Sequence, residues 1–322
     1  MKKTFLYFCL LFIVQTAFAA DSLYVREQQI PILIDRIDNV LYEMRIPAQK
    51  GDVLNEITIQ IGDNVDLSDI QAIRLFYSGV EAPSRKGEHF SPVTYISSHI
   101  PGNTRKALES YSVRQDEVTA PLSRTVKLTS KQPMLKGINY FWVSIQMKPE
   151  TSLLAKVATT MPNAQINNKP IDITWKGKVD ERHVGIGVRQ AGDDGSAAFR
   201  IPGLVTTNNG TLLGVYDIRY NSSVDLQEKI DIGVSRSTDK GQTWEPMRVA
   251  MTFKQTDGLP HGQNGVGDPS ILVDEKTNTI WVVAAWTHGM GNERAWWNSM
   301  PGMTPDETAQ LMLCLLYTSP SP

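Results

Sequence analysis

An internal repeat restricts the carboxyl-terminal half of this chain to a repetitive β architecture. Residues 202–215 contain two short apolar stretches separated by a polar turn, and residues 269–283 contain the same arrangement. The copies are offset by 67 positions at their prolines and by 68 after the turn. A further echo, at a spacing of 79, relates residues 231–234 to residues 310–313. Strands repeated in this way predict a β-propeller, in which each blade buries its apolar face against its neighbours.

An eight-residue motif of the form S-x-D-x-G-x-T-W, the Asp-box, supports the same fold. It is formed by Ser237, Asp239, Gly241, Thr243 and Trp244. The aspartate can accept hydrogen bonds from N–H groups of a turn, and the glycine can adopt a backbone angle that other residues resist. The tryptophan can bury a large surface at the start of the next strand. Because these roles are structural, the motif indicates the fold and not the chemistry.

The amino-terminal half has the pattern of a separate all-β domain. Apolar side chains alternate in residues 57–61 and again in residues 141–147, as in strands with one buried face. Turn-forming residues separate these strands, which predicts a β-sandwich over residues 21–180. We place the boundary near 180, after a last strand at 171–175. A carbohydrate-binding role and a spacer role for this domain both remain open.

The first twenty residues have the features of a secretory signal peptide. Lys2 and Lys3 precede an apolar run at 5–14, and Ala17 and Ala19 place small residues at the two positions that a signal peptidase inspects. Cleavage near Ala19 would release a secreted or periplasmic protein. No later segment approaches 18 uninterrupted apolar residues, so no membrane span is expected.

Charge and residue spacing exclude other classes of function. The chain has 32 Lys and Arg against 34 Asp and Glu, a formal charge of −2, which argues against a basic nucleic-acid-binding protein. Its five histidines show no metal-ligand spacing, and we expect neither a metal nor another cofactor.

A second motif connects the repeat to a known family. Phe199-Arg-Ile-Pro is followed by Asp217-Ile-Arg-Tyr-Asn, then by Asp225, and then by the Asp-box. With this combination, residues 183–313 resemble a bacterial retaining exo-sialidase (neuraminidase). The amino-terminal half resembles, more loosely, the sandwich that precedes the propeller in some gut-bacterial sialidases. The resemblance implies an all-β chain with a β-sandwich followed, in residues 181–313, by the first blades of a six-bladed propeller.

The resemblance also implies a substrate, namely terminal sialic acids on glycoproteins, gangliosides and oligosaccharides, hydrolysed with retention of configuration. Sialic acid carries a carboxylate on its anomeric carbon, and a guanidinium group can bind a carboxylate through two parallel hydrogen bonds. The family's first carboxylate-binding arginine matches Arg200.

The other site residues follow in the same way. The general acid/base of the family matches Asp225, which must protonate the leaving oxygen and then deprotonate water. Asp217 and Asp231 are the competing candidates for this role. Arg219 matches a second arginine of the sugar pocket. Asp268 matches a pocket aspartate, although Asp-Pro is also an ordinary start of a turn.

Sialidases use a tyrosine nucleophile, activated by a glutamate, in place of a second carboxylate. In the family these two residues and two further arginines lie downstream of the region present here, so we expect this chain by itself to be inactive. Shifting the Asp-box by 79 positions finds no box residue near the carboxyl terminus. We therefore interpret residues 314–322 as a non-native tail, and Tyr317 is not taken as the nucleophile.

Two other functions remain open. The chain can be a non-catalytic secreted glycan-binding protein whose sandwich is the functional part, but this leaves Arg200 and Asp225 without a role. It can also be another Asp-box propeller with different ligands, which gives no reason for an arginine at position 200. The sequence does not indicate protein partners.

Overall fold

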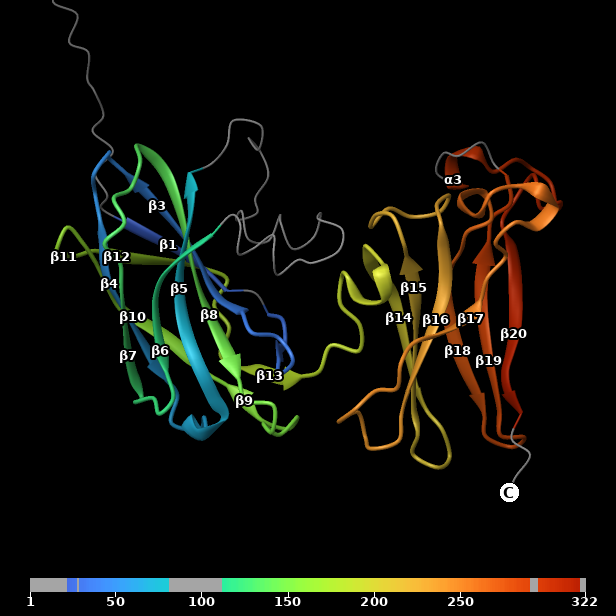
Figure 1. The fold of residues 1–322 in the computed structure, drawn as a ribbon, viewed down its shortest axis with the longest axis horizontal. Helices are drawn as coiled ribbons and strands as arrows, with labels where there is room; N and C mark the ends of the chain where they lie inside the picture. Colours follow the sequence, from blue (N-terminus) through green and yellow to red (C-terminus); the bar gives the residue numbers. More distant parts are fainter. Residues whose placement is uncertain (1–21, 28, 81–111, 290–294, 319–322) are drawn as a thin grey trace, which may run out of the picture.

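The computed structural model describes residues 22–27, 29–80, 112–289 and 295–318, which form two β bodies joined by one segment of chain (Figure 1). The predicted signal peptide lies outside the described residues. Nearly all regular structure is strand. The described helical elements are the short helix α3 (Ala295–Asn298) and the 3-10 turns η1 (Leu67–Asp69), η3 (Asp193–Gly195), η4 (Thr256–Gly258) and η5 (His261–Gln263). The predicted all-β class is confirmed.

The amino-terminal body is a sandwich of two sheets with a small third sheet at its end. The larger sheet has the spatial order β12 (Asp172–Lys176), β1 (Ser22–Arg26), β3 (Asn39–Ala48), β8 (Gly137–Met147), β5 (Ile70–Val80) and β6 (Val113–Thr119). The facing sheet has the order β11 (Lys169–Pro170), β10 (Thr159–Ile166), β4 (Leu54–Ile61) and β7 (Thr125–Thr129). The small sheet has the order β2 (Ile32–Leu33), β13 (Arg182–Gly185) and β9 (Lys156–Val157).

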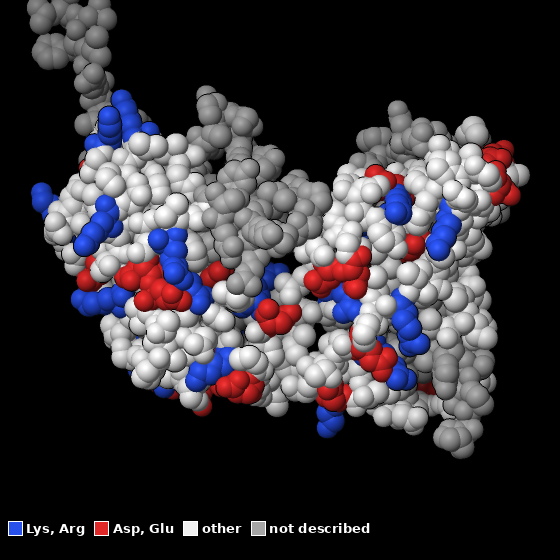
Figure 2. Space-filling model, viewed as in Figure 1, with Lys and Arg blue, Asp and Glu red and all other residues white. Residues whose placement is uncertain are grey.

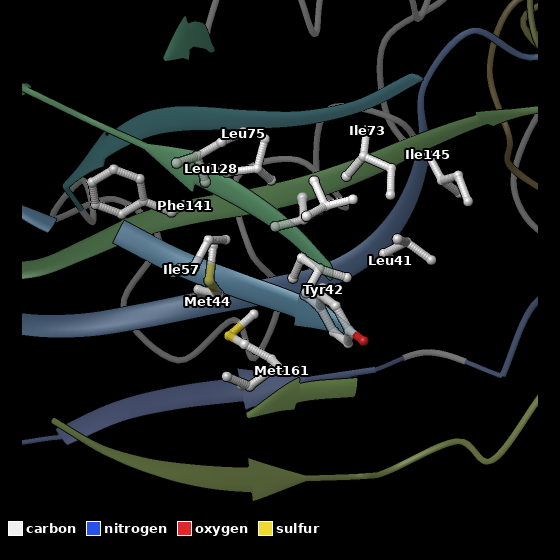
Figure 3. Close-up of a cluster of buried hydrophobic side chains, with 14 of the residues drawn as sticks. Leu41, Tyr42, Met44, Ile57, Ile73, Leu75, Leu128, Phe141, Ile145 and Met161 are labelled. Atoms are coloured by element: carbon white, nitrogen blue, oxygen red, sulfur yellow. The ribbon is translucent and has the colours of Figure 1, made fainter. Parts of the chain in front are cut away.

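One continuous apolar core lies between the two main sheets. Met44, Ile57, Leu75, Leu128 and Phe141 approach one another there from five different strands (Figure 3). Each of these side chains is almost completely removed from water. Burial of this kind contributes about 1.5–3 kcal/mol for each large side chain, which makes the core the main source of stability in this body.

Strand β8 differs from its predicted pattern because both of its faces are buried. Alternation in residues 141–147 predicted a single buried face, but Trp142 and Ser144 on the opposite face are also inaccessible to water. Trp142 stacks on Phe76 with ring centroids 4.1 Å apart. The Ser144 hydroxyl donates to Oδ1 of Asp38 at 2.7 Å. Because β8 lies between β3 and β5, its neighbours supply side chains to both faces.

The amino-terminal body continues beyond the predicted boundary at 180. Strand β13 pairs in parallel with β2 and antiparallel with β9, so the body ends at Gly185. This pairing joins segments about 150 residues apart, which a local pattern cannot reveal. The chain then leads to the second body through residues 186–197. Within this linker, the Gln190 side chain accepts from Arg36 at 3.0 Å and donates to Asp35 at 2.6 Å.

The carboxyl-terminal body consists of two facing sheets, as expected for the first blades of a propeller (Figure 1). The first sheet has the order β14 (Ala198–Thr206), β15 (Leu212–Arg219), β16 (Ile230–Ser237) and β17 (Arg248–Met251). The second has the order β18 (Val266–Asp274), β19 (Thr279–Trp286) and β20 (Gln310–Thr318). A shared apolar core, with Val215, Ile232 and Val282 at its centre, lies between the two sheets.

The sequence repeat corresponds to equivalent positions in these two sheets. In the first sheet Arg200 pairs with Asp217, which pairs with Ile232. In the second sheet the row with the same offsets is Gly267, Ala285 and Leu311. The spacings of 67, 68 and 79 found in the sequence therefore relate the first, second and third strands of the first blade to the equivalent strands of the second blade.

The repeat also includes a backbone irregularity. The β14–β15 pairing slips between Arg200 and Gly203, and the β18–β19 pairing slips between Gly267 and Ser270. In both bulges the residue before proline is left-handed, with φ of 51° at Ile201 and 56° at Asp268. A β-branched residue rarely adopts this conformation, so the bulge at Ile201 is a strained feature beside Arg200.

Strand β20 includes part of the segment that we interpret as a non-native tail. Its pairing with β19 continues to Thr318 but slips between Leu315 and Tyr317. The equivalent β15–β16 pairing runs over its whole length without a slip. The interpretation of residues 314–322 stays a prediction.

The Asp-box forms a tight turn after β16. The Asp239 carboxylate accepts from the Thr243 N–H at 3.0 Å and from the Thr243 and Ser237 hydroxyls. These hydrogen bonds lower the pKa of Asp239 to about 2. Gly241, with φ of 88°, supplies the left-handed backbone angle, and the Trp244 ring packs over Gly214 on β15.

The face of the two bodies drawn in Figure 2 carries mixed charge. On the face drawn in Figure 2, Lys and Arg side chains are interspersed with Asp and Glu on both bodies. In the described part of the chain, no helix has the length and apolar composition required to cross a membrane.

Candidate functional site

Three of the predicted site residues meet at one end of the first sheet. Arg200 lies near the start of β14, Arg219 ends β15, and Asp225 lies in the loop that connects β15 with β16. Antiparallel pairing brings the start of β14 beside the end of β15, and the following loop therefore closes over both arginines. Asp268 comes from the adjacent start of β18 in the second sheet.

The Asp225 carboxylate is shared between the two arginines. Its Oδ1 accepts from Nη1 of Arg200 at 2.9 Å and from Nη1 of Arg219 at 2.5 Å. Both guanidinium groups also donate to the backbone carbonyl of Ser223, at 3.0 and 2.9 Å. Asp225 and Arg200 are 42% and 43% exposed, whereas Arg219 is 1% exposed. A ligand can therefore reach Asp225 and Arg200, while the buried Arg219 holds Asp225 from beneath.

A buried carboxylate lies behind Arg219. Oδ2 of Asp217 accepts from Nε of Arg219 at 3.0 Å and from Nη2 at 2.7 Å. Asp217 has no exposed surface, and burial raises its pKa to about 6 even though Arg219 acts in the opposite direction.

The two alternatives to Asp225 as the acid are thus both buried in strands. Asp217 is enclosed by Arg219, and Asp231 on β16 is 2% exposed. Asp231 accepts from the Tyr220 hydroxyl at 3.0 Å and contacts Nε2 of His261 at 2.8 Å. A group that transfers protons to a substrate must be reachable from solvent, and of these three aspartates Asp225 has that property.

The loop that carries Asp225 is anchored on helix α3 and on residues that border strands β18 and β19 of the second sheet. Leu226 is buried, and its backbone carbonyl accepts from the Ala295 N–H at 3.1 Å. The Gln227 side chain forms hydrogen bonds with Thr287 at the end of β19. Gly265 passes beneath the loop so closely that a Cβ there would lie 2.3 Å from the Glu228 carbonyl oxygen. Both sheets therefore determine the position of Asp225.

Asp268 is held in the site region by its backbone. Its N–H donates to Oδ1 of Asp217 at 2.9 Å, and the residue itself is exposed. Among the described residues, no group of three or more His, Cys, Asp and Glu side chains is arranged to bind a metal ion.

The known proteins that resemble this chain are sialidases. Residues 20–170 match the family described as the N-terminal domain of BNR-repeat neuraminidase. A sialidase of Bacteroides fragilis is 56% identical over 319 residues, which is 97% of this chain and 58% of that protein. Over almost its whole length, this chain is therefore similar to a bacterial sialidase.

Two further similarities show how far this relationship extends. The structure of a Hadza microbial sialidase, Hz136, superposes with a TM-score of 0.75 at 60% identity, covering 90% of this chain and 56% of that one. A sialidase of Paraclostridium sordellii is 34% identical over 114 residues, 35% of this chain and 26% of that protein. The chain thus spans less than two thirds of the length of these relatives.

Sequence patterns did not reveal every part of this candidate site. The Ser223 carbonyl, which accepts from both arginines, carries no side-chain signal. Asp217 was considered only as an alternative acid, although it contacts Arg219 and the Asp268 backbone. Its position two residues before Arg219 was the available signal, because alternate residues of a strand lie on the same face.

Proposed function

We propose that the protein containing this chain is an exo-sialidase that removes terminal sialic acids from glycoconjugates with retention of configuration. The observation that carries the proposal is the arrangement of one accessible arginine, one buried arginine and one accessible aspartate at the end of the first blade. Sialidase relatives that align over almost all of this chain support it.

Arg200 would bind the sugar carboxylate. Its ion pair with Asp225 joins two side chains that are each more than 40% exposed. Pairs of this kind contribute only about 0–1 kcal/mol, so an incoming carboxylate can replace Asp225 as the partner of Arg200 at small cost. The strained bulge at Ile201 fixes where the arginine leaves the strand.

Asp225 would act as general acid and then as general base. Its Oδ1 accepts hydrogen bonds from both guanidinium groups. When the sugar carboxylate binds Arg200, it would replace Asp225 as the partner of this arginine and release the Asp225 carboxyl group. Substrate binding would thereby prepare the acid beside the glycosidic oxygen. Arg219 and Asp268 would contact the sugar and its surroundings.

The remaining parts of the proposal concern the whole protein. A tyrosine nucleophile would be supplied from outside this chain, and the signal peptide would direct the protein to the periplasm or the exterior. Neither binding of nucleic acid nor a metal or other cofactor is part of this mechanism.

The test is turnover of a fluorogenic sialoside by the 322-residue chain and, in parallel, by a gene product extended to the length of its relatives. We expect activity in the extended protein and none in this chain. In the extended protein, Asp225→Asn should lower kcat by about 10²–10⁴-fold, the usual contribution of a general acid–base group. Proton NMR of the released sugar should show the α anomer first, as retention requires.

Arg200→Ala provides the second arm, because loss of a carboxylate partner should raise KM strongly. Asn209→Ala, in the turn between β14 and β15 at the opposite end of the sheet, is the matched control and should not change turnover. Unchanged turnover in Asp225→Asn, or turnover by the 322-residue chain itself, would contradict the proposed roles.

A further inference from the structure

Asp217 makes contacts that a purely structural residue of the blade does not need. Its two carboxylate oxygens face different parts of the site. Oδ2 accepts two hydrogen bonds from Arg219 on its own strand, and Oδ1 accepts one from the Asp268 N–H of the other sheet. The backbone of Gly267 lies directly over it, since a Cβ at this position would be 3.4 Å from both oxygens. Asp217 thus joins the two blades where the site residues emerge.

The contacts of Arg219 divide its guanidinium group into two halves. Nε and Nη2 are directed to Asp217, and Nη1 is directed to Asp225 and the Ser223 carbonyl. Without Asp217, the buried cation would have the Asp225 carboxylate as its nearest anion and could bind it through both prongs. Such a pair would turn the Asp225 carboxylate toward Arg219 and away from a ligand on the exposed side.

The second blade provides an internal comparison. The positions equivalent to Asp217 and Arg219 are Ala285 and Thr287, and the position equivalent to Arg200 is Gly267. The same three-strand arrangement therefore forms without a buried ion pair. Buried ion pairs are weak sources of stability because desolvation offsets the attraction between the charges. Burial indeed raises the pKa of Asp217, so the fold maintains this carboxylate at an energetic cost.

We propose that Asp217 is a positioning residue that directs Arg219 to Asp225 and fixes the Asp268 bulge of the next blade. This inference rests on the proposed function, because the groups that Asp217 positions are those assigned to the sugar and the acid. Asp217 itself touches no substrate. Charged groups near its carboxylate, within the described residues, are Arg219 on β15, Arg200 on β14 and Asp268 on β18.

The first experiment measures kinetics of Asp217→Asn in the extended, active protein. The asparagine keeps the size of the side chain but removes the charge that holds Arg219. We expect kcat/KM to fall about 10- to 100-fold, as misplacement of about 1 Å can produce, with most of the loss in kcat. Asp231→Asn is the matched control, because Asp231 is equally buried on the adjacent strand and contacts neither arginine. It should lose thermal stability to a similar degree and keep its kcat.

A double-mutant cycle separates positioning from general damage. If Asp217 acts through Arg219, then Asp217→Asn should have little further effect on kcat/KM in an Arg219→Ala background. Additive losses in kcat/KM, or equal losses of kcat in Asp217→Asn and Asp231→Asn, would overturn the inference.

The second experiment does not depend on activity. The Arg219 Nε–H donates to Asp217, so its resonance in a ¹H–¹⁵N NMR spectrum of the 322-residue chain reports this contact. We expect a protected signal that shifts with pH in the wild-type chain and is lost or shifted in Asp217→Asn. An unchanged signal would overturn the inference. If the extended wild-type protein shows no turnover while this signal behaves as expected, the proposed function fails and the positioning of Arg219 by Asp217 stands.

Discussion

The two bodies of this chain differ in how they bury their apolar side chains. In the amino-terminal sandwich, two sheets enclose one core, and residues such as Phe141 and Ile57 are almost completely buried. In the carboxyl-terminal body, the two blades bury the faces that they share, but the opposite face of the second blade is open. Leu272 and Leu313 are each 61% exposed there, and Leu311 is 80% exposed.

This difference reflects two modes of stabilisation. A sandwich completes its core within itself, whereas a blade needs a neighbour on each side. Leu272, Trp281 and Leu315 stand in one row of the open face, so the face is apolar across all three strands. We therefore expect the two bodies to respond differently to the same kinds of substitution.

The largest difference is expected for a core deletion. Phe141→Ala should lower the unfolding free energy of the sandwich by about 3–5 kcal/mol, because it leaves a cavity between two sheets. Leu272→Ala on the open face should change stability by less than about 0.5 kcal/mol. Calorimetry of the two variants measures both effects. Equal destabilisation would mean that the open face is covered in solution.

A smaller effect is expected from pH, through Asp217. Its pKa is raised to about 6, so the folded body binds this proton more tightly than the unfolded chain does. The stabilisation is therefore complete below the unfolded pKa and is lost as pH rises through about 6. Because the pKa of Asp217 rises from 3.8 in the unfolded chain to about 6 in the folded body, the loss in unfolding free energy amounts to at most about 3 kcal/mol.

Denaturant unfolding between pH 4 and pH 7 tests this expectation. The carboxyl-terminal body of Asp217→Asn should lack this part of the pH dependence, while the sandwich should respond as in the wild type. The same slope in both proteins would show that another group is responsible.

The smallest change in stability is expected on the open face itself. Leu313→Gln should leave the unfolding free energy within about 0.5 kcal/mol and should reduce self-association measured by light scattering, because exposed apolar patches promote contacts between molecules. Leu213→Gln, whose side chain is buried between the blades, is the contrasting variant and should be strongly destabilised. If Leu313→Gln associated as readily as the wild type, the exposed face would not be the site of association.

Patterns in the sequence predicted the strands and the repeat because these depend on neighbouring residues. The alternation of residues 57–61 lies within β4, and the proline repeat marks the bulges at Ile201 and Asp268. The parallel pairings of β13 with β2 and of β12 with β1 were not predicted, because they join segments about 150 residues apart. The burial of Trp142 on the second face of β8 was missed because its stacking partner, Phe76, comes from another strand that local alternation does not identify.

The sequence by itself determined the all-β class, the repeat and the Asp-box turn, since the hydrogen bonds of Asp239 reach no farther than four residues. Only the tertiary structure decided which acidic groups are reachable. Asp217 and Asp225 lie eight positions apart in the sequence. The second blade nevertheless encloses Asp217, while the β15–β16 loop leaves Asp225 open to solvent. Desolvation depends on atoms contributed from distant parts of the chain, and local sequence does not specify them.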